Sequence, residues 1–168
     1  KASELAPDDR ELLLLLCDAY SASGRGKDAA AALEKIVASF AGRRTKELAG
    51  IHFRLSRAYK AEGDLTRALA ELDQAFRIDP GSVSILAELG ALSLEAGDLD
   101  KAQRTYRALL LQKLEPGAPI TKGEVFYYLG EISHRLGDKA RAVQMLERAI
   151  ENDASLDKAK ALLEELKK

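Results

Sequence analysis

The chain has 168 residues and a formal net charge of −1, because 26 Lys and Arg nearly balance 27 Asp and Glu. A duplex-binding domain normally carries a basic excess, so this balance argues against nucleic acid as a partner, and one cysteine with two histidines gives no internal disulfide and a poor set of metal ligands. The composition is rich in helix formers apart from 12 glycines, so either the chain is not helical or the glycines occupy special positions.

Taken in chain order, the predicted elements start with a tail over residues 1–7 that belongs to an earlier repeat. Pro7 stands where Pro80 stands two repeats and one insertion later, so the residues before it are interpreted as the end of a preceding second helix, and the natural protein is expected to extend upstream. Four helix–turn–helix units and a final helix follow. Their predicted ranges are 8–41, 45–80, 82–115, 121–154 and 155–168.

A glycine marks the turn inside each of the four units. These glycines are Gly24, Gly63, Gly97 and Gly137. Gly63 and Gly97 lie 34 residues apart, and the other two intervals are five and six residues longer. Glycine tolerates the left-handed backbone that ends a helix, and the aspartate that follows three of the four suits the start of the next helix. The spacing predicts an internal repeat.

The residues around these glycines recur in a helical pattern. Leucine lies eight residues before each glycine, at Leu16, Leu55, Leu89 and Leu129. A small residue lies seven before it, at Cys17, Ser56, Gly90 and Gly130, and an alanine five after it, at Ala29, Ala68, Ala102 and Ala142. The residues eleven, eight, seven and four before the glycine differ by 3, 1 and 3 positions and share one helix face, and the residues five, nine and twelve after it share one face of a second helix. We expect close packing of the two helices at the small residue and the alanine, because overpacking by a larger side chain typically costs ~1–3 kcal/mol.

With Tyr20 and Tyr59 four residues before their glycines and Pro80 closing the second unit, this pattern resembles the tetratricopeptide repeat. The second unit is the most similar, while Ser93 and Ser133 replace the tyrosine in the third and fourth. The resemblance implies an all-α fold: one right-handed superhelical solenoid of four repeats with a C-terminal capping helix. It also implies that first helices line a concave groove, which binds a peptide or helix of a partner protein.

Two insertions interrupt the regular spacing, at residues 42–46 and 115–120. Each is either tolerated loop variation or a loop that contacts a ligand. Directly after the second insertion, Thr121 and Glu124 have the spacing of a capping box, which predicts the start of a helix there.

The last segment is predicted to be a capping helix. Ser155 is expected to cap it, and its apolar face extends to about Leu166. If this were a fifth first helix, Glu164 would fall at the small-residue position. A solvated cap is therefore favoured over a further repeat.

The sequence predicts no catalytic residue, metal or cofactor. His52 is interpreted as a packing histidine and His134 as lying on a neighbouring, exposed face, and neither has a partner at a metal-ligand spacing. Cys17 is expected to behave as a small buried apolar residue. The Gly24–Lys27 segment is interpreted as a turn, because it lacks the length and the strand–helix context of a phosphate loop.

The candidate binding surface is the remaining face of the first helices. Its residues are Leu14 and Asp18 in the first unit, Phe53, Arg54, Arg57 and Lys60 in the second, Glu88, Ala91 and Leu94 in the third, and Tyr127, Tyr128, Glu131 and His134 in the fourth. The second unit gives a basic patch, the third a small apolar surface and the fourth an aromatic surface with an acid. Arginine can hold a carboxylate, and aromatic rings supply contact area. The carboxylate clamp of chaperone-binding relatives is incomplete, so that function is not assigned.

The favoured function is a non-catalytic interaction module that binds a peptide or helix of another protein. Two alternatives stay open: a regulatory or targeting segment of a larger enzyme or signalling protein, and a homo-oligomerisation scaffold that uses an open N-terminal edge. A monomer or weak homo-oligomer is expected. The longest apolar run, Leu12–Cys17, is far below the ~18 residues of a membrane span. A single unpaired cysteine is compatible with the cytoplasm without defining the compartment.

Overall fold

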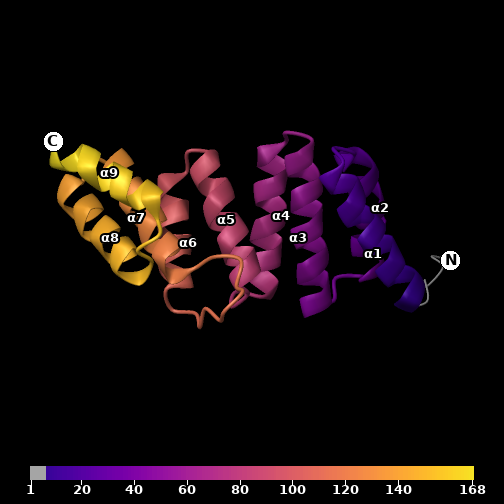
Figure 1. Ribbon diagram of the computed structural model, residues 1–168. Coiled ribbons are helices and arrows are strands. Elements are labelled where there is room, and N and C mark those ends of the chain that lie inside the picture. The colour runs from indigo at the N-terminus through magenta and orange to yellow at the C-terminus, as the bar shows by residue number, and fades with distance from the viewer. Residues whose placement is uncertain (1–6) are drawn as a thin grey trace. The chain divides into compact units, whose positions relative to one another are not determined.

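The computed structural model describes residues 7–168, and in this range the regular secondary structure is α-helical throughout (Figure 1). The helices are α1 (Pro7–Ala22), α2 (Gly26–Ser39), α3 (Lys46–Ala61), α4 (Leu65–Ile78), α5 (Val83–Glu95), α6 (Leu99–Leu109), α7 (Lys122–Arg135), α8 (Lys139–Asn152) and α9 (Asp157–Lys167). The predicted all-α fold is confirmed. The tail predicted over residues 1–7 lies outside the described residues except for Pro7, which begins α1.

The four glycine turns connect successive helices as predicted. Gly24, Gly63, Gly97 and Gly137 all have positive φ, between 75° and 80°, which is the backbone that favours glycine. The aspartate after three of them caps the next helix. In each case its carboxylate accepts a hydrogen bond from the backbone N–H three residues on, and the aspartates are Asp64, Asp98 and Asp138.

The small residue in the first helix allows close approach of the second helix. A Cβ atom on Gly90 would lie 2.9 Å from the ring of Tyr106, and one on Gly130 would lie 2.9 Å from Leu146. The four predicted alanines are all fully buried. The expectation of close packing at these two positions is therefore confirmed.

The chain divides into two compact units, each with its own packed helices. Unit 1 ends at Pro80 and contains α1–α4, and unit 2 runs from Gly81 to Lys168 and contains α5–α9. Within unit 1, α3 packs against α1, α2 and α4; within unit 2, α7 packs against α6 and α8, and α8 packs against α9. That the whole chain acts as one solenoid domain stays a prediction.

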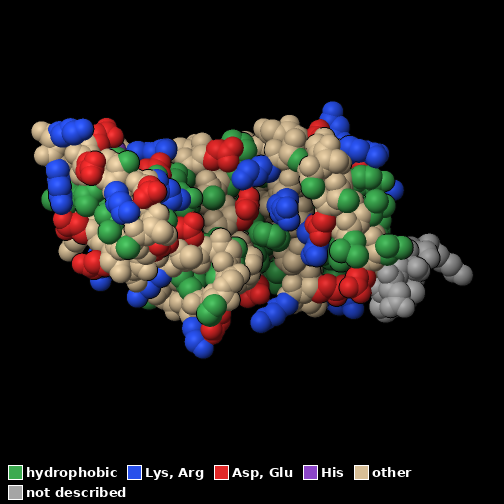
Figure 2. Space-filling model, viewed as in Figure 1, with side chains coloured by type: hydrophobic (Ala, Val, Ile, Leu, Met, Phe, Trp, Pro, Cys, Tyr) green, Lys and Arg blue, Asp and Glu red, His purple; other side chains and the backbone are tan. Residues whose placement is uncertain are grey.

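The first repeat differs from the others at its leucine position. Leu16 shares the repeat position of the buried Leu55, yet 43% of its surface is exposed, and Leu12 on the same face is 70% exposed. Leu55 lies in α3, which packs against α2, whereas no second helix among the described residues precedes α1. Figure 2 shows the hydrophobic side chains gathered at the α1 end of unit 1.

The two predicted helix starts near the C-terminus have different outcomes. Thr121 and Glu124 form the capping box at the start of α7, as predicted. Ser155 does not cap α9: its hydroxyl donates to the carboxylate of Asp153 at 2.6 Å, and α9 begins two residues later, after Leu156. The Asp153 carboxylate competes successfully for the serine because it is only two residues away.

Candidate functional site

The first-helix face of unit 1 is less basic than its sequence indicated. Arg54 on α3 donates from Nε to Oδ2 of Asp18 on α1 at 3.1 Å, and each side chain is about one-third exposed. Two predicted site residues thus neutralise each other. Arg57 is exposed, whereas Lys60, Phe53 and Leu14 are half-buried.

His52 has a carboxylate partner within unit 1. Its Nδ1 lies 2.6 Å from Oε2 of Glu71 on α4, and the imidazole is 12% exposed. This contact agrees with the interpretation of His52 as a packing histidine. Glu71 was missed, because nothing in the local helical pattern relates two residues 19 positions apart.

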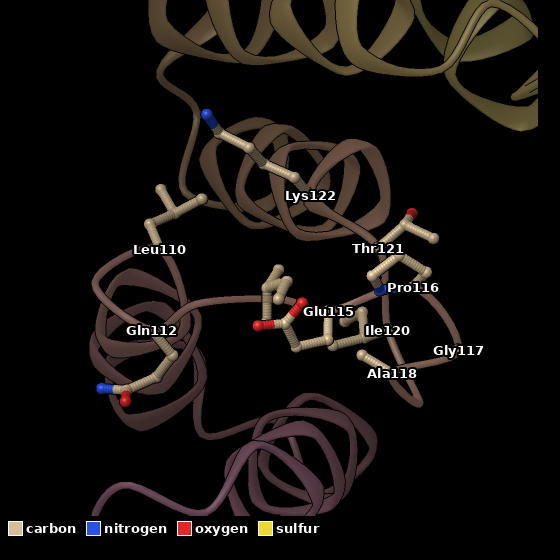
Figure 3. Close-up of a pocket in the computed structure, with 10 residues that line it drawn as sticks. Leu110, Gln112, Glu115, Pro116, Gly117, Ala118, Ile120, Thr121 and Lys122 are labelled. Carbon is tan, nitrogen blue, oxygen red and sulfur yellow. The ribbon is translucent and has the colours of Figure 1, made fainter.

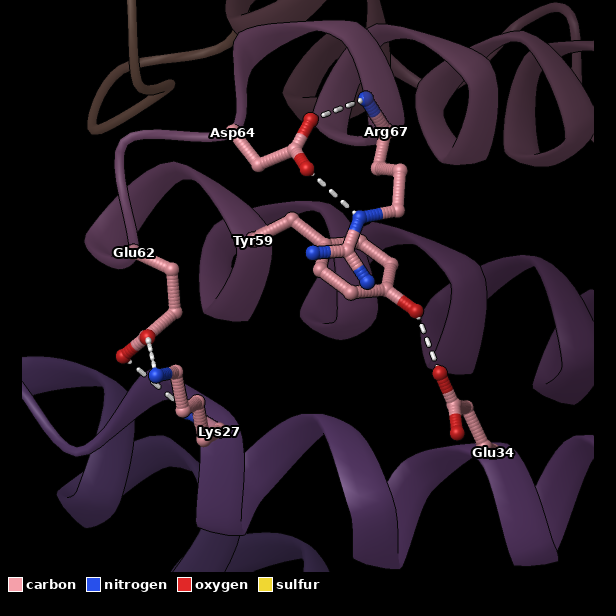
Figure 4. A network of polar contacts seen from close by, with 6 residues as sticks. All are labelled: Lys27, Glu34, Tyr59, Glu62, Asp64 and Arg67. Atoms are coloured by element: carbon pink, nitrogen blue, oxygen red, sulfur yellow. Dashed lines mark hydrogen bonds and ion pairs between the residues drawn. The ribbon is translucent and has the colours of Figure 1, made fainter.

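Tyr59, at the tyrosine position of the repeat, connects three helices of unit 1 (Figure 4). Its hydroxyl donates to Glu34 on α2, and the guanidinium of Arg67 on α4 lies 4.4 Å from its ring centroid. Arg67 is in turn held 2.6 Å from the Asp64 carboxylate. Burial and the Glu34 carboxylate raise the pKa of Tyr59 to about 12. These contacts brace the helices behind the candidate face.

In unit 2 the first-helix face contains a groove of about 390 Å³ between α5 and α7. Its walls are Ala91, Leu94 and Glu95 from α5 and Tyr128, Glu131 and Arg135 from α7. The structure therefore brings together Ala91, Leu94, Tyr128 and Glu131, which the sequence had placed on one candidate surface. The groove combines apolar walls with an ion pair between Arg135 and Glu131.

An aromatic cluster borders this groove. The Tyr128 ring stacks on that of Tyr106 from α6, with centroids 4.9 Å apart and planes at 11°. Tyr127 meets Tyr128 edge-on at 5.2 Å, and the ammonium of Lys158 from α9 lies 4.5 Å from the Tyr127 centroid. Tyr106 is fully buried, its hydroxyl has no hydrogen-bond partner in the structure, and burial raises its pKa strongly.

The remaining predicted residues of unit 2 lie around the groove without lining it. Glu88 and Tyr127 are half-buried, and His134 is exposed, as expected for the neighbouring face. Sequence reasoning missed Tyr106 and Lys158, because they come from α6 and α9 and only the fold brings them to the α7 surface.

The insertion before α7 borders a second, open pocket in unit 2, of about 400 Å³ (Figure 3). Figure 3 shows Leu110 and Gln112 at the end of α6 on one side, with Ala118 and Thr121 on the other and Glu115 between them. Glu115 pairs with Lys113 at 2.6 Å. Whether this insertion contacts a ligand stays a hypothesis.

Within the described residues, no group of three His, Cys, Asp or Glu side chains is arranged to hold a metal ion. Cys17 is buried, and burial raises the pKa of its thiol. None of the described helices has the length and hydropathy that crossing a membrane requires.

Solved structures with the same architecture cover nearly the whole chain. A tetratricopeptide repeat protein from Parabacteroides merdae matches with a TM-score of 0.77 at 20% identity, over 94% of this chain and 59% of its own. MamA from Desulfovibrio magneticus gives 0.75 at 17% identity, over 93% and 82%. The pilF protein of Pseudomonas aeruginosa gives 0.74 at 19% identity, over 94% and 67%. At these identities the likeness shows the fold, an all-α tetratricopeptide solenoid.

A curated relative is the human protein O-mannosyl-transferase TMTC1, which is 27% identical over 181 aligned positions. The match covers 99% of this chain and 19% of TMTC1, so the chain spans about a fifth of that relative's length. Family models of the tetratricopeptide repeat match residues 14–83, 59–119 and 124–155. Since these matches follow one another along most of the chain and agree with its fold, the chain belongs to the tetratricopeptide repeat family.

Proposed function

We propose that the chain is a non-catalytic protein-interaction module, which binds a peptide or helix of a partner protein on the first-helix faces of its units. The observation that carries this proposal is the groove between α5 and α7 in unit 2. A concave surface with apolar walls and a few polar groups is the common form of a binding site. Membership of the tetratricopeptide family supports protein as the partner.

The groove has the chemistry of a peptide site. Ala91 offers apolar surface beside the mostly buried Leu94, Tyr128 adds a partly exposed ring, and Glu131 and Arg135 offer a carboxylate and a guanidinium. Aromatic and arginine side chains contribute most at protein interfaces. In unit 1, Arg57 is the better probe of the same face, because a change at Arg54 also breaks its contact with Asp18.

The test starts from a pull-down with the intact protein, in which bound partners are identified by mass spectrometry and the binding segment is mapped. Ala91→Arg, which fills the groove, is then compared with Ala140→Arg on the exposed surface of α8. We expect Ala91→Arg to weaken binding by about tenfold or more and Ala140→Arg to leave it within about twofold. Equal affinity of the two variants, both shown to be folded by circular dichroism, contradicts the proposal.

A second candidate function is a regulatory or targeting segment of a larger enzyme. The observation that favours it is the match to one-fifth of TMTC1, which is named as a protein O-mannosyl-transferase. The complete coding sequence tests this alternative: a gene product without any catalytic domain excludes it.

A third candidate is a homo-oligomerisation scaffold. The observation that favours it is the exposed leucine face of α1. Exposed apolar patches of this kind mark protein contacts.

A further inference from the structure

The rings of Tyr127 and Tyr128, beside the unit 2 groove, are already in contact with a cation. Tyr106 covers one face of the Tyr128 ring, and Tyr127 stands edge-on to it at 63°. The Lys158 ammonium lies 4.5 Å from the centroid of Tyr127 and 5.0 Å from that of Tyr128. Both distances are within the ~6 Å range of a cation–π contact. Tyr106 is fully buried, whereas the Lys158 side chain that supplies the ammonium is exposed to solvent.

The charged residues around Tyr127 and Tyr128 also favour a cation as the ligand. α5 carries Glu88 and Glu95 and no basic residue. The residues that line the groove include two carboxylates, Glu95 and Glu131, against the single guanidinium of Arg135. Glu131, Glu88 and Glu124 all act on the buried Tyr106 hydroxyl, where their negative charge adds to the effect of burial in raising its pKa. The residues that line the groove thus carry one more carboxylate than guanidinium, and this excess favours a cation over a phosphate group at the rings.

We propose that this face binds an arginine side chain of the partner segment on Tyr127 and Tyr128, and that Lys158 occupies the same place in the free protein. The proposal rests on the proposed peptide-binding function and names the chemistry of its partner: a basic segment with apolar residues next to its arginine. Arginine fits better than lysine, because its planar guanidinium stacks on a ring and also donates two hydrogen bonds to one carboxylate.

An arginine ligand can displace the Lys158 side chain from the rings. Lys158 lies in the first turn of α9, its side chain is exposed, and its cation–π contact with the rings belongs to the weak, solvated kind. The apolar side of α9, with Ala159 and Leu163, stays packed on α8. The ammonium can therefore leave the rings by side-chain rotation alone, without unfolding of the helix. Lys158 thus acts as an internal competitor that sets the affinity for the arginine.

The test uses two fluorescein-labelled peptides with blocked termini, in which two leucines alternate with two arginines or with two citrullines. Citrulline has the shape of arginine without its charge. Binding is measured by anisotropy on the whole chain. We expect the arginine peptide to bind about tenfold more tightly than the citrulline peptide, and Lys158→Met to tighten its binding by about threefold to tenfold. Lys160→Met is the matched control, because Lys160 lies on the same helix but pairs with Asp157.

A second measurement follows the lysine directly. The ε-methylene protons of Lys158 should show an upfield ring-current shift that returns to the ordinary position as the arginine peptide is added. Equal binding of the two peptides overturns the proposal, as does unchanged or weaker binding in Lys158→Met. If the mapped partner still depends on Ala91 in that case, the cation proposal alone has failed. If the partner ignores Ala91 as well, the peptide-binding function has failed with it.

Discussion

At the scale of single residues, Tyr59 shows how one side chain of this repeat connects its helix to both neighbouring helices; we call this set of contacts the brace. Its ring lies beneath Arg67 of α4 while its hydroxyl reaches Glu34 of α2, so one residue of α3 contacts both neighbouring helices. A hydrogen bond to a charged acceptor stabilises a fold more than a neutral one does. The brace depends on the hydroxyl being protonated, because a tyrosinate facing Glu34 has no hydrogen to donate.

Because the hydrogen bond needs a protonated Tyr59, unit 1 is expected to lose stability at high pH. The pKa of Tyr59 is raised to about 12 from an ordinary value of about 10. A raised pKa of an acid means that the fold favours the protonated form, so the stabilisation is complete below pH ~10 and is lost as the pH rises towards 12. We expect Tyr59→Phe to lower the free energy of unfolding by about 1–2 kcal/mol at pH 8. The difference from the wild type should shrink between pH 10 and 12.

Urea unfolding of both proteins from pH 8 to 12 measures that difference. Because Tyr106 and Tyr127 also have raised pKa values, both proteins lose stability in alkali, and only the difference between them reports on Tyr59. A difference that stays constant across the range contradicts this account.

The helix face of a residue was predictable from its place in the repeat. Its contacts with residues on other helices were not, because the fold alone brings those residues together. Tyr59 was recognised from its distance to Gly63, because that distance fixes its helix face. Glu34 lies 25 residues away on another helix, so no local spacing pointed to the pair. The same holds for the ion pair of Arg54 with Asp18, which turned a predicted basic patch into a partly neutralised one.

At the scale of helices, the spacing between two members of a pair is set by the small residue in the first helix, which is a glycine in α5 and α7. In α7, a Cβ on Gly130 would lie 2.9 Å from Leu146 Cγ and 3.3 Å from the Ala142 carbonyl oxygen. Gly50 in α3 differs, since a Cβ there would have as its nearest neighbour an Arg54 nitrogen at 3.6 Å. The same substitution should therefore have opposite effects at the two sites.

We expect Gly130→Ala to destabilise the protein and Gly50→Ala to stabilise it. Overpacking costs about 1–3 kcal/mol, which generally exceeds the ~0.5–1 kcal/mol that alanine gains over glycine inside a helix. At Gly50 alanine gains this helix propensity without any overpacking. Urea unfolding of both variants measures the two changes, and a stabilised Gly130→Ala protein shows that α7 and α8 can separate without penalty.

Helix starts and ends were predictable to the extent that their caps are local. The turn glycines and their aspartates, and the Thr121–Glu124 box, all act within four residues, and all appear as expected. Ser155 has the right chemistry for a cap, but the Asp153 carboxylate lies as near in sequence and takes its hydroxyl. The pattern that indicated Ser155 as a cap considers only the residues after it, so it did not reveal this contact with the preceding Asp153.

At the scale of the whole molecule, the leucine face of α1 is the feature that a repeat pattern alone does not explain. Leu12 and Leu16 occupy the positions of Ile51 and Leu55 in α3, which are 1% and 2% exposed. The repeat therefore specifies a surface for a neighbouring helix, and in α1 that surface stays largely exposed among the described residues of unit 1. Burying apolar surface is favourable by about 25 cal/mol per Å². Association with a second copy of the chain that buries the leucine face of α1 is therefore favourable.

We therefore expect the 168-residue chain to associate weakly through α1 at concentrations of roughly 10–100 μM. Leu12→Lys with Leu16→Lys should abolish this association, and it should leave the protein folded, because Leu12 is 70% and Leu16 43% exposed and a lysine ammonium can reach solvent from both positions. Leu111→Lys is the control, because Leu111 is 85% exposed in the connection after α6 and belongs to unit 2 rather than to α1. Sedimentation velocity across this range measures the association. A monomer at every concentration removes the homo-oligomer alternative, and association that survives the double substitution places the contact elsewhere.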